Sequence, residues 1–170
     1  MRPFFCCFGG ARKLKRYVAL AMFVLLPLAA GGLGSIATAR SVAEWYPLLV
    51  KPWWNPPSWV FGPVWTVLYI FMGVAAWRVW CSAGSFGSAR SAMILFLLQL
   101  ALNAAWSWLF FGFRMPGAAL AELLLLWVFI VATIRTFFVY DLVAAWMMVP
   151  YLAWVSFAGA LNAAIWILNR

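Results

Sequence analysis

Five long apolar runs constrain the fold of this chain more than any other feature of its sequence. They lie at about residues 17–37, 59–80, 92–112, 118–138 and 142–167. Each has about 20 residues, the length that a helix needs to cross the hydrocarbon core of a bilayer. Of the 170 residues, 68% are hydrophobic and only 9% are charged, which is more apolar surface than a soluble domain of this size can bury. The sequence therefore predicts an all-α, multi-pass integral membrane protein, built as a bundle of five transmembrane helices.

A short basic segment precedes the first apolar run. Residues 1–16 contribute five basic side chains to the net charge of +9: Arg2, Arg12, Lys13, Lys15 and Arg16. Placed directly before a membrane helix, such a segment favours a cytosolic N-terminus and contact with anionic membrane lipid over binding to nucleic acid. We expect this tail to be disordered. Its adjacent Cys6 and Cys7 are either free thiols or sites of palmitoylation, and both alternatives stay open.

The composition excludes several kinds of site. Histidine is absent, which excludes a histidine-ligated haem, a typical histidine-containing zinc site and a Ser-His-Asp triad. The three cysteines form neither a metal-binding pattern nor a disulfide framework. We therefore expect no metal site and no required cofactor, and the sequence offers no conventional acid–base or metal catalysis.

A stretch rich in proline and tryptophan joins the first two apolar runs. Between Glu44 and Pro63 the prolines recur so closely that a regular helix cannot form. Each proline removes a backbone donor and pushes the preceding residue toward an extended conformation. The stretch leads directly into the second apolar run, where Trp65 and Tyr69 lie one helical turn apart. We expect residues 39–58 to form a rigid aromatic loop that covers a ligand site as a lid.

Polar and aromatic side chains recur at helical spacing inside three of the predicted spans. Asn103 and Trp106 share a face of the third span, and Trp65 and Tyr69 share a face of the second. A similar face of the fifth span carries Trp154, Ala158, Leu161 and Asn162. Amides inside a bilayer need partners, so the two asparagines face protein or a cavity, either as interhelical hydrogen-bonding groups or as part of a ligand site. Such a pocket would suit a flat aromatic ligand that stacks on indole rings, or a sterol that fits through shape and apolar area.

Other features inside the spans leave alternatives open. Four tryptophans lie too deep for an interfacial aromatic belt to explain and are candidates for ligand contact: Trp65, Trp106, Trp127 and Trp154. Glu122 is the only acid within a predicted span, and it is either a functional carboxylate or an acid favoured by the nearby helix N-terminus. Gly31, Gly32 and Gly34 allow a neighbouring helix or a ligand to approach closely. Three pairs of small residues either pack helices within the bundle or form a dimer contact: Ala101/Ala105, Gly117/Ala121 and Gly159/Ala163.

Four segments together resemble a known family. They are WYPLLVKPWWNPPSWVFGPVWTVLYIFMG at 45–73, QLALNAAWSWLFFG at 99–112, ALAELLLL at 119–126 and PYLAWVSFAGALNAAIW at 150–166. In this order they are similar to the motifs of the translocator protein family, also called the tryptophan-rich sensory protein or peripheral benzodiazepine receptor family. The resemblance covers about residues 18–167. It implies a five-helix transmembrane bundle that is often dimeric, with a ligand pocket beneath the first loop.

The resemblance also implies a ligand class and a set of pocket residues. Members bind porphyrins such as protoporphyrin IX or haem, sterol-like molecules and synthetic aromatic ligands, with roles in tetrapyrrole or lipid transport and in stress responses. Carried over by motif, the pocket comprises Phe61, Val64, Trp65, Asn103, Trp106, Trp154, Ala158 and Leu161. Some members degrade protoporphyrin in light with two pocket tryptophans, which match Trp65 and Trp154. The cholesterol-recognition segment of animal members is not matched, because Ala163, Ala164 and Ile167 stand at its tyrosine and arginine positions.

Three functions compete at this stage. The first is binding and transport of porphyrins, sterols or other hydrophobic ligands by a protein that contacts membrane lipid and forms a homodimer. The second is a light- and oxygen-dependent enzyme that degrades porphyrin with Trp65 and Trp154. The third is a structural membrane protein that acts through partners. The sequence favours the first. The membrane is left open between the outer membrane of a bacterium or mitochondrion and the endoplasmic reticulum or Golgi of a plant-like cell.

Overall fold

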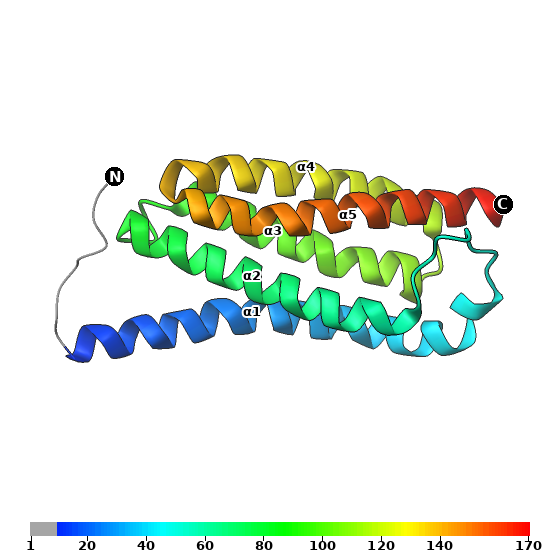
Figure 1. The fold of residues 1–170 in the computed structure, drawn as a ribbon, viewed down its shortest axis with the longest axis horizontal. Coiled ribbons are helices and arrows are strands. Elements are labelled where there is room, and N and C mark those ends of the chain that lie inside the picture. Colours follow the sequence, from blue (N-terminus) through cyan, green and yellow to red (C-terminus); the bar gives the residue numbers. More distant parts are fainter. Residues whose placement is uncertain (1–9) are drawn as a thin grey trace.

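The computed structural model describes the backbone of residues 10–170 and the side chains from Leu14 onward. Five long helices make up most of it (Figure 1): α1 (Gly10–Glu44), α2 (Ser58–Ala83), α3 (Arg90–Ser107), α4 (Pro116–Tyr140) and α5 (Leu142–Leu168). Each of them, α3 together with the turn that continues it to Gly112, is long and apolar enough to cross a membrane. The chain is therefore an integral multi-pass membrane protein, and the predicted all-α bundle of five spans is confirmed.

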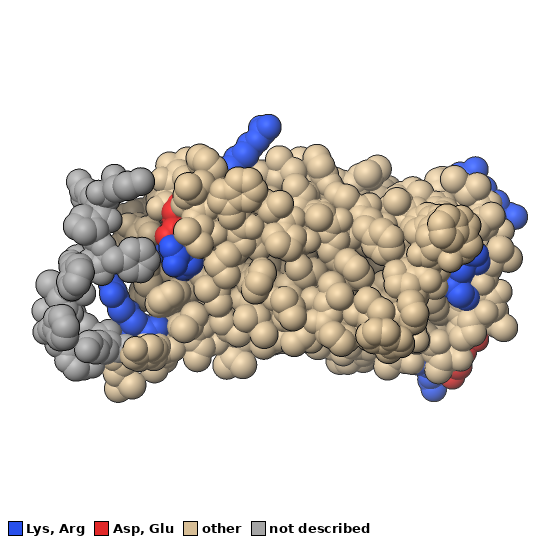
Figure 2. Space-filling model, viewed as in Figure 1, with Lys and Arg blue, Asp and Glu red and all other residues tan. Residues whose placement is uncertain are grey.

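The five helices pack in a closed ring. Around this ring α1 contacts α2, α2 contacts α5, α5 contacts α4, α4 contacts α3, and α3 returns to α1. The helices run along the long axis of the molecule, so that the long loop, the α3–α4 turn and the C-terminus gather at one end (Figure 1). Most of the charged side chains visible in Figure 2 lie toward the two ends. The uncharged belt between them suits the hydrocarbon layer of a bilayer.

Small residues bring the helices close together. A Cβ atom added to Gly73 of α2 would lie 2.6 Å from the backbone oxygen of Phe23 and 2.6 Å from the Cα atom of Val24, both in α1. Likewise, the ring of Tyr69 lies against Gly31 of α1. Lipid tails are as apolar as the helix surfaces, so close van der Waals packing of this kind, rather than a hydrophobic driving force, holds membrane helices together.

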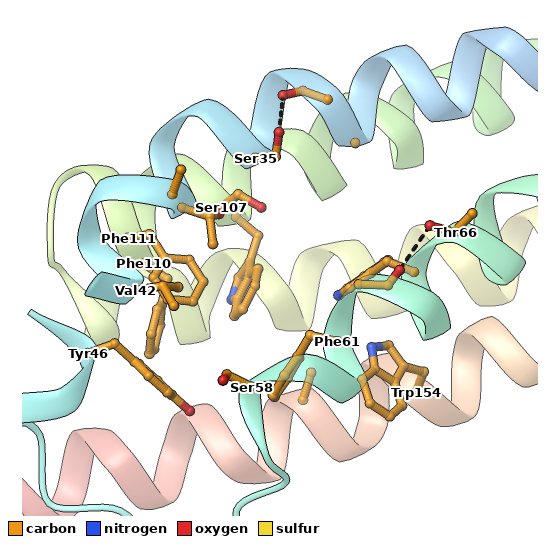
Figure 3. Close-up of a pocket in the computed structure, with 18 of the residues that line it drawn as sticks. Ser35, Val42, Tyr46, Ser58, Phe61, Thr66, Ser107, Phe110, Phe111 and Trp154 are labelled. Carbon is orange, nitrogen blue, oxygen red and sulfur yellow. Dashed lines mark hydrogen bonds between the residues drawn. The ribbon is translucent and has the colours of Figure 1, made fainter. Parts of the chain in front are cut away.

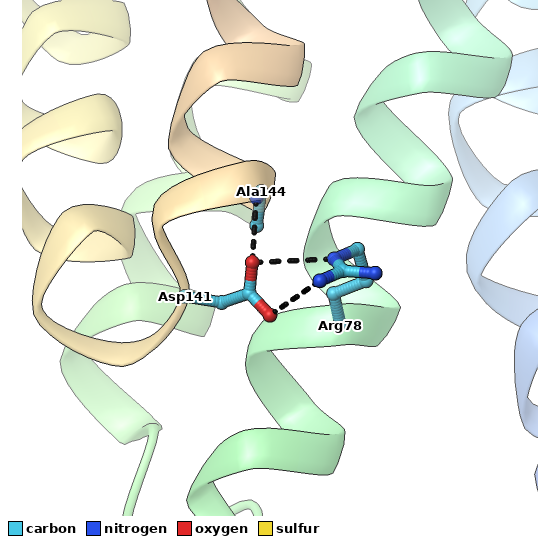
Figure 4. A network of polar contacts seen from close by, with 3 residues as sticks. All are labelled: Arg78, Asp141 and Ala144. Atoms are coloured by element: carbon cyan, nitrogen blue, oxygen red, sulfur yellow. Dashed lines mark hydrogen bonds and ion pairs between the residues drawn. The ribbon is translucent and has the colours of Figure 1, made fainter. Parts of the chain in front are cut away.

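An ion pair joins α2 to the start of α5 at the end opposite the long loop (Figure 4). Arg78 Nη2 donates to Asp141 Oδ2 at 2.9 Å, and Arg78 Nε donates to Asp141 Oδ1 at 3.2 Å. Asp141 Oδ1 also accepts from the backbone N–H of Ala144 at 2.8 Å and so caps α5. The two charged side chains are only 20% and 14% exposed. Charge-assisted pairs with this fork geometry are among the stronger polar contacts in proteins.

The ends of α1 differ from the sequence-based expectation. Residues 10–16 form the first turns of α1, whereas the sequence predicted disorder over residues 1–16; long basic side chains are good helix formers and continue a span readily. At its other end α1 runs to Glu44, where Arg40 Nε lies 3.8 Å from a Glu44 carboxylate oxygen. The connection to α2 is correspondingly shorter than predicted. The expectations for residues 1–9, including Cys6 and Cys7, lie outside the described residues.

Candidate functional site

A cavity of about 540 Å³ lies inside the ring of helices, at the end where the long loop crosses (Figure 3). Its walls come from α1, α2, α3 and α5, and Tyr46 of the loop completes it. Aromatic, small apolar and hydroxyl-bearing side chains line it, and none of the lining residues that the structure describes is charged. Binding sites for small molecules and cofactors typically measure about 300–1,000 Å³ and have this apolar character.

The walls from α2 and α5 are mainly aromatic. Trp65 stacks on Tyr69 with ring centres 5.4 Å apart, and Phe61 meets Trp154 edge to face at 5.8 Å. In Figure 3 the rings of Phe61 and Trp154 lie side by side at the cavity. Trp154 Nε1 is buried and has no hydrogen-bond partner among the described residues. A buried indole N–H normally has a partner, so this donor is an exception.

A wider turn at the end of α3 shapes the third wall. A π-helical turn covers Trp108–Gly112 and is closed by the N–H of Phe113, which donates to the Trp108 carbonyl at 2.7 Å. Two adjacent side chains of this turn, Phe110 and Phe111, line the cavity. Phe110 stacks on Trp106, one turn earlier, at 5.3 Å. Single π-helical turns are frequent at functional sites.

Two buried asparagines tie the cavity walls together. Asn103 Oδ1 accepts from the Tyr69 hydroxyl at 2.8 Å, and Asn103 Nδ2 donates to the Tyr151 hydroxyl at 3.2 Å. Asn162 Oδ1 accepts from Trp106 Nε1 at 3.2 Å, while its Nδ2 donates to the Pro116 carbonyl at 2.7 Å. Both amides therefore form interhelical hydrogen bonds, as buried polar groups inside a bilayer require. Asn162 lines the cavity as well.

The long loop is braced from within and at the C-terminus. The Tyr46 hydroxyl donates to Asn55 Oδ1 at 2.7 Å, and Lys51 Nζ donates to the carbonyl oxygens of Tyr46 and Leu49 at 2.7 and 3.0 Å. Burial raises the pKa of Tyr46 more than its hydrogen bond to Asn55 lowers it, so the hydroxyl stays protonated and remains a donor at neutral pH. The loop packs with other aromatic residues against the α3 and α5 side chains at this end. Of the loop residues that the structure describes, Tyr46 is the one that reaches the cavity wall.

Most of the site residues predicted from the sequence meet at this cavity. Eight of the ten line it: Phe61, Trp65, Tyr69, Trp106, Trp154, Ala158, Leu161 and Asn162. The other two, Val64 and Asn103, do not. Val64 packs against the core of the bundle, and Asn103 is 3% exposed and lies behind Tyr69, which it holds in place. Asn103 therefore supports the wall of the cavity and is not part of it.

Two candidates from the sequence lie elsewhere. Trp127 is 39% exposed on the outer side of α4, where its Nε1 donates to Ser156 Oγ at 2.9 Å. Glu122 does not line the cavity, and its two carboxylate oxygens are buried without a hydrogen-bond partner among the described residues. The depth of a residue in its span therefore did not predict which way it faces.

On the wall from α1, the sequence indicated only the glycines as positions for a ligand. One stripe of this helix lines the cavity with Leu28, Gly31, Gly32, Ser35, Thr38, Ala39 and Val42. These residues are small or aliphatic, so in a membrane helix they look the same whether they face lipid, protein or a ligand. The adjacent glycines Gly31 and Gly32 were the signal of a close approach. In the structure Tyr69 approaches the first, and the second faces open space.

Comparison with known proteins places the chain in one group. The model of the TspO/MBR family matches residues 23–167. A tryptophan-rich protein TspO from Chlorobaculum tepidum is 44% identical over 155 residues, which are 91% of this chain and 98% of that protein. The tryptophan-rich sensory protein of Cereibacter sphaeroides is 40% identical over 88% of this chain and 92% of its own length. The human translocator protein is 40% identical over 87% of this chain and 88% of its own length.

Proposed function

Because this chain belongs to the TspO/MBR family, we propose that it binds porphyrins and other flat or sterol-like hydrophobic molecules in its cavity and carries them within or across the membrane. The observation that carries this proposal is the cavity itself, an uncharged space of about 540 Å³ lined by indole and phenyl rings. The names of the relatives, translocator protein and tryptophan-rich sensory protein, agree with a carrier or sensor role. A role in stress response or tetrapyrrole regulation is part of the same proposal.

The chemistry of the cavity favours a ligand with a flat, neutral body. Rings stack well on Trp65 and Trp106, and burial of apolar area contributes about 25 cal/mol per Å². Burying a carboxylate without a cationic partner is costly. The two carboxylates of protoporphyrin IX would therefore project out of the cavity, away from its uncharged walls.

A titration with protoporphyrin IX in the dark tests this proposal. The detergent-purified protein is titrated while its tryptophan fluorescence and the porphyrin absorption band are followed. We expect saturable binding, and a loss of affinity of about tenfold or more, equal to at least about 1.4 kcal/mol, when Trp65→Ala and Trp154→Ala are combined. Trp127→Ala is the matched control, since this tryptophan lies outside the cavity. Equal affinities for the wild type and the double variant would contradict the placement of the ligand.

One observation favours conversion of the porphyrin as a second function. Trp65 and Trp154 both belong to the cavity wall, so a bound porphyrin would lie against two indoles. In this alternative light excites the porphyrin, dioxygen is the oxidant, and an indole relays an electron. Illumination of the complex in air should then give new absorbing products. Trp65→Phe with Trp154→Phe should preserve binding and abolish this turnover, whereas turnover at the wild-type rate would exclude the indole role.

A further inference from the structure

Six residues of the cavity wall are also exposed on the outer surface of the protein. Three lie on α1 and three on α2, and we call them the portal residues: Gly32, Ser35, Ala39, Ser58, Gly62 and Thr66. Every other lining residue, including all of those from α3 and α5, is buried or half-buried. The open side of the cavity therefore lies between α1 and α2.

The packing of α1 explains why the two helices leave this opening. On one side of it α1 and α2 are in close contact, at Gly73 and again where Tyr69 lies against Gly31. From Gly31 toward the long loop, α1 makes close contacts with the end of α3. There Ser107 lies against Gly34, and the Ser41 hydroxyl donates to the Phe111 carbonyl. Toward the loop, α1 thus follows α3 and separates from α2.

The two glycines among the portal residues have no packing role. A Cβ atom added to Gly32 or Gly62 would meet nothing within 4 Å in the described part of the chain, in contrast to Gly31, Gly34 and Gly73. Glycine in a helix interior costs about 0.5–1 kcal/mol relative to alanine. Since close packing does not account for them, we relate their missing side chains to the opening that they flank.

The opening lies at the depth of the lipid acyl chains. At a rise of 1.5 Å per residue, Gly32 lies about 18 Å from the Glu44 end of α1 and Thr66 about 12 Å from the Ser58 end of α2. The hydrocarbon layer is about 30 Å thick, so much of the opening faces lipid and not water. The rim suits that environment. The hydroxyls of Ser35 and Thr66 donate to the carbonyls of Gly32 and Gly62 in their own helices, at 2.7 and 2.9 Å, so these two donors are satisfied where they face lipid.

We propose that ligands pass between the bilayer and the cavity sideways, through this lateral portal between α1 and α2. The ligand class is therefore one that partitions into lipid and can slide flat between two helices. The route from water beneath the long loop is the alternative. The long loop lies across that route, and Asn169 holds it through two 2.9 Å hydrogen bonds to the backbone N–H and carbonyl of Val50. The inference rests on the proposed function, since it needs a cavity that binds ligand.

Binding kinetics in lipid vesicles test the portal. Protoporphyrin IX is equilibrated with protein-free vesicles, these are mixed with protein-containing vesicles, and association and dissociation are followed by fluorescence quenching. Gly32→Leu and Gly62→Leu add side chains at the opening, where a Cβ atom meets nothing within 4 Å in the described part of the chain, and the alanine variants give an intermediate step. We expect each leucine variant to slow association and dissociation by a similar factor of about tenfold, the effect of about 1.4 kcal/mol on a barrier. The dissociation constant should change less than either rate, because a narrower opening slows passage in both directions.

Two controls separate the outcomes. Gly87→Leu is the matched control, since its surroundings are also open but it lies in the loop after α2, away from the cavity. Asn169→Ala releases the long loop, and it should leave the rates unchanged if ligands use the portal. Rates in Gly32→Leu and Gly62→Leu that equal the wild-type rates would overturn the portal. If the wild-type protein itself shows no saturable binding, the proposed function fails before the portal is tested.

Discussion

Asn103 is a position where a single substitution should affect both stability and binding without touching the ligand. Its amide joins the hydroxyls of Tyr69 in α2 and Tyr151 in α5, at 2.8 and 3.2 Å. Asn103→Leu keeps the approximate size of the side chain and removes both hydrogen bonds. The two tyrosine hydroxyls then lie inside a membrane-spanning bundle without these partners.

The expected cost follows from the number of bonds lost. Hydrogen bonds between side chains of membrane helices average about 0.6 kcal/mol and reach about 1.7 kcal/mol, so the loss of two predicts about 1–3 kcal/mol of unfolding free energy. Ligand affinity should fall less, by about two- to tenfold, equal to about 0.4–1.4 kcal/mol, because Tyr69 still stacks on Trp65 but its ring is no longer fixed. The unfolding free energy is measured by titration with dodecyl sulfate in mixed micelles, and affinity by the porphyrin titration.

A background variant makes this reasoning refutable. Tyr69→Phe with Tyr151→Phe removes both hydroxyls and preserves both rings. When both partners of a hydrogen bond are replaced by apolar groups of similar shape, the change is nearly neutral. Asn103→Leu should therefore cost much less in this background than in the wild type. If it costs the same in both, the two hydrogen bonds are not the source of the effect and the packing of Asn103 is.

Two further pairs of substitutions probe the bundle itself, each measured by the same unfolding titration. Asp141→Asn keeps the cap on Ala144 but loses the charge that faces Arg78, and the unfolding free energy should fall by about 1–2 kcal/mol. Asp141→Ala should cost about 1 kcal/mol more, because the cap is also lost. Equal losses for the two variants would contradict the capping role. Gly73→Val drives a side chain into the backbone of α1 and should lower the unfolding free energy by about 3 kcal/mol. Gly32→Ala adds a methyl group that meets nothing within 4 Å in the described part of the chain, so it should be neutral or slightly stabilising. Similar effects at both glycines would contradict the close contact at Gly73.

The number and order of the helices could be predicted because span length and hydropathy are set by the bilayer and not by tertiary packing. The residues at which the helices begin and end could not be predicted in the same way. Residues 38–44 contain Thr38, Arg40 and Glu44 and look like the start of a polar loop. In the structure Thr38 bonds back to the Gly34 carbonyl at 3.0 Å, and α1 continues to Glu44. Local hydrogen bonds and side-chain pairs of this kind extend a helix past its apolar segment, and a hydropathy pattern does not report them.

The cavity was predicted where its walls contain chemically distinctive residues. Tryptophans and amides are unusual inside a membrane span, and on α2, α3 and α5 contact with the cavity or hydrogen bonds around it account for them. Where a wall consists of small apolar residues, as on α1, the sequence holds no comparable signal. Trp127 illustrates the converse error. Because lipid and protein interior are both apolar, a membrane helix lacks the polar face that would indicate its orientation, and this tryptophan faces outward with Ser156 as its partner.

The three pairs of small residues limit which helix faces are left for contact with a second copy of the chain. In one pair Gly117 packs against Trp166 of α5, and in another Gly159 packs against Leu123 of α4. Both glycines are therefore used inside the bundle, where α4 and α5 meet. In the third pair Ala101 is exposed and Ala105 is half-buried on α3, and Ala121, which forms a pair with Gly117, is exposed on α4. A small exposed residue in a membrane helix lets the backbone of another helix approach closely. If two copies of this chain associate, we accordingly expect them to meet at the face of α3 around Ala101 or at the face of α4 around Ala121.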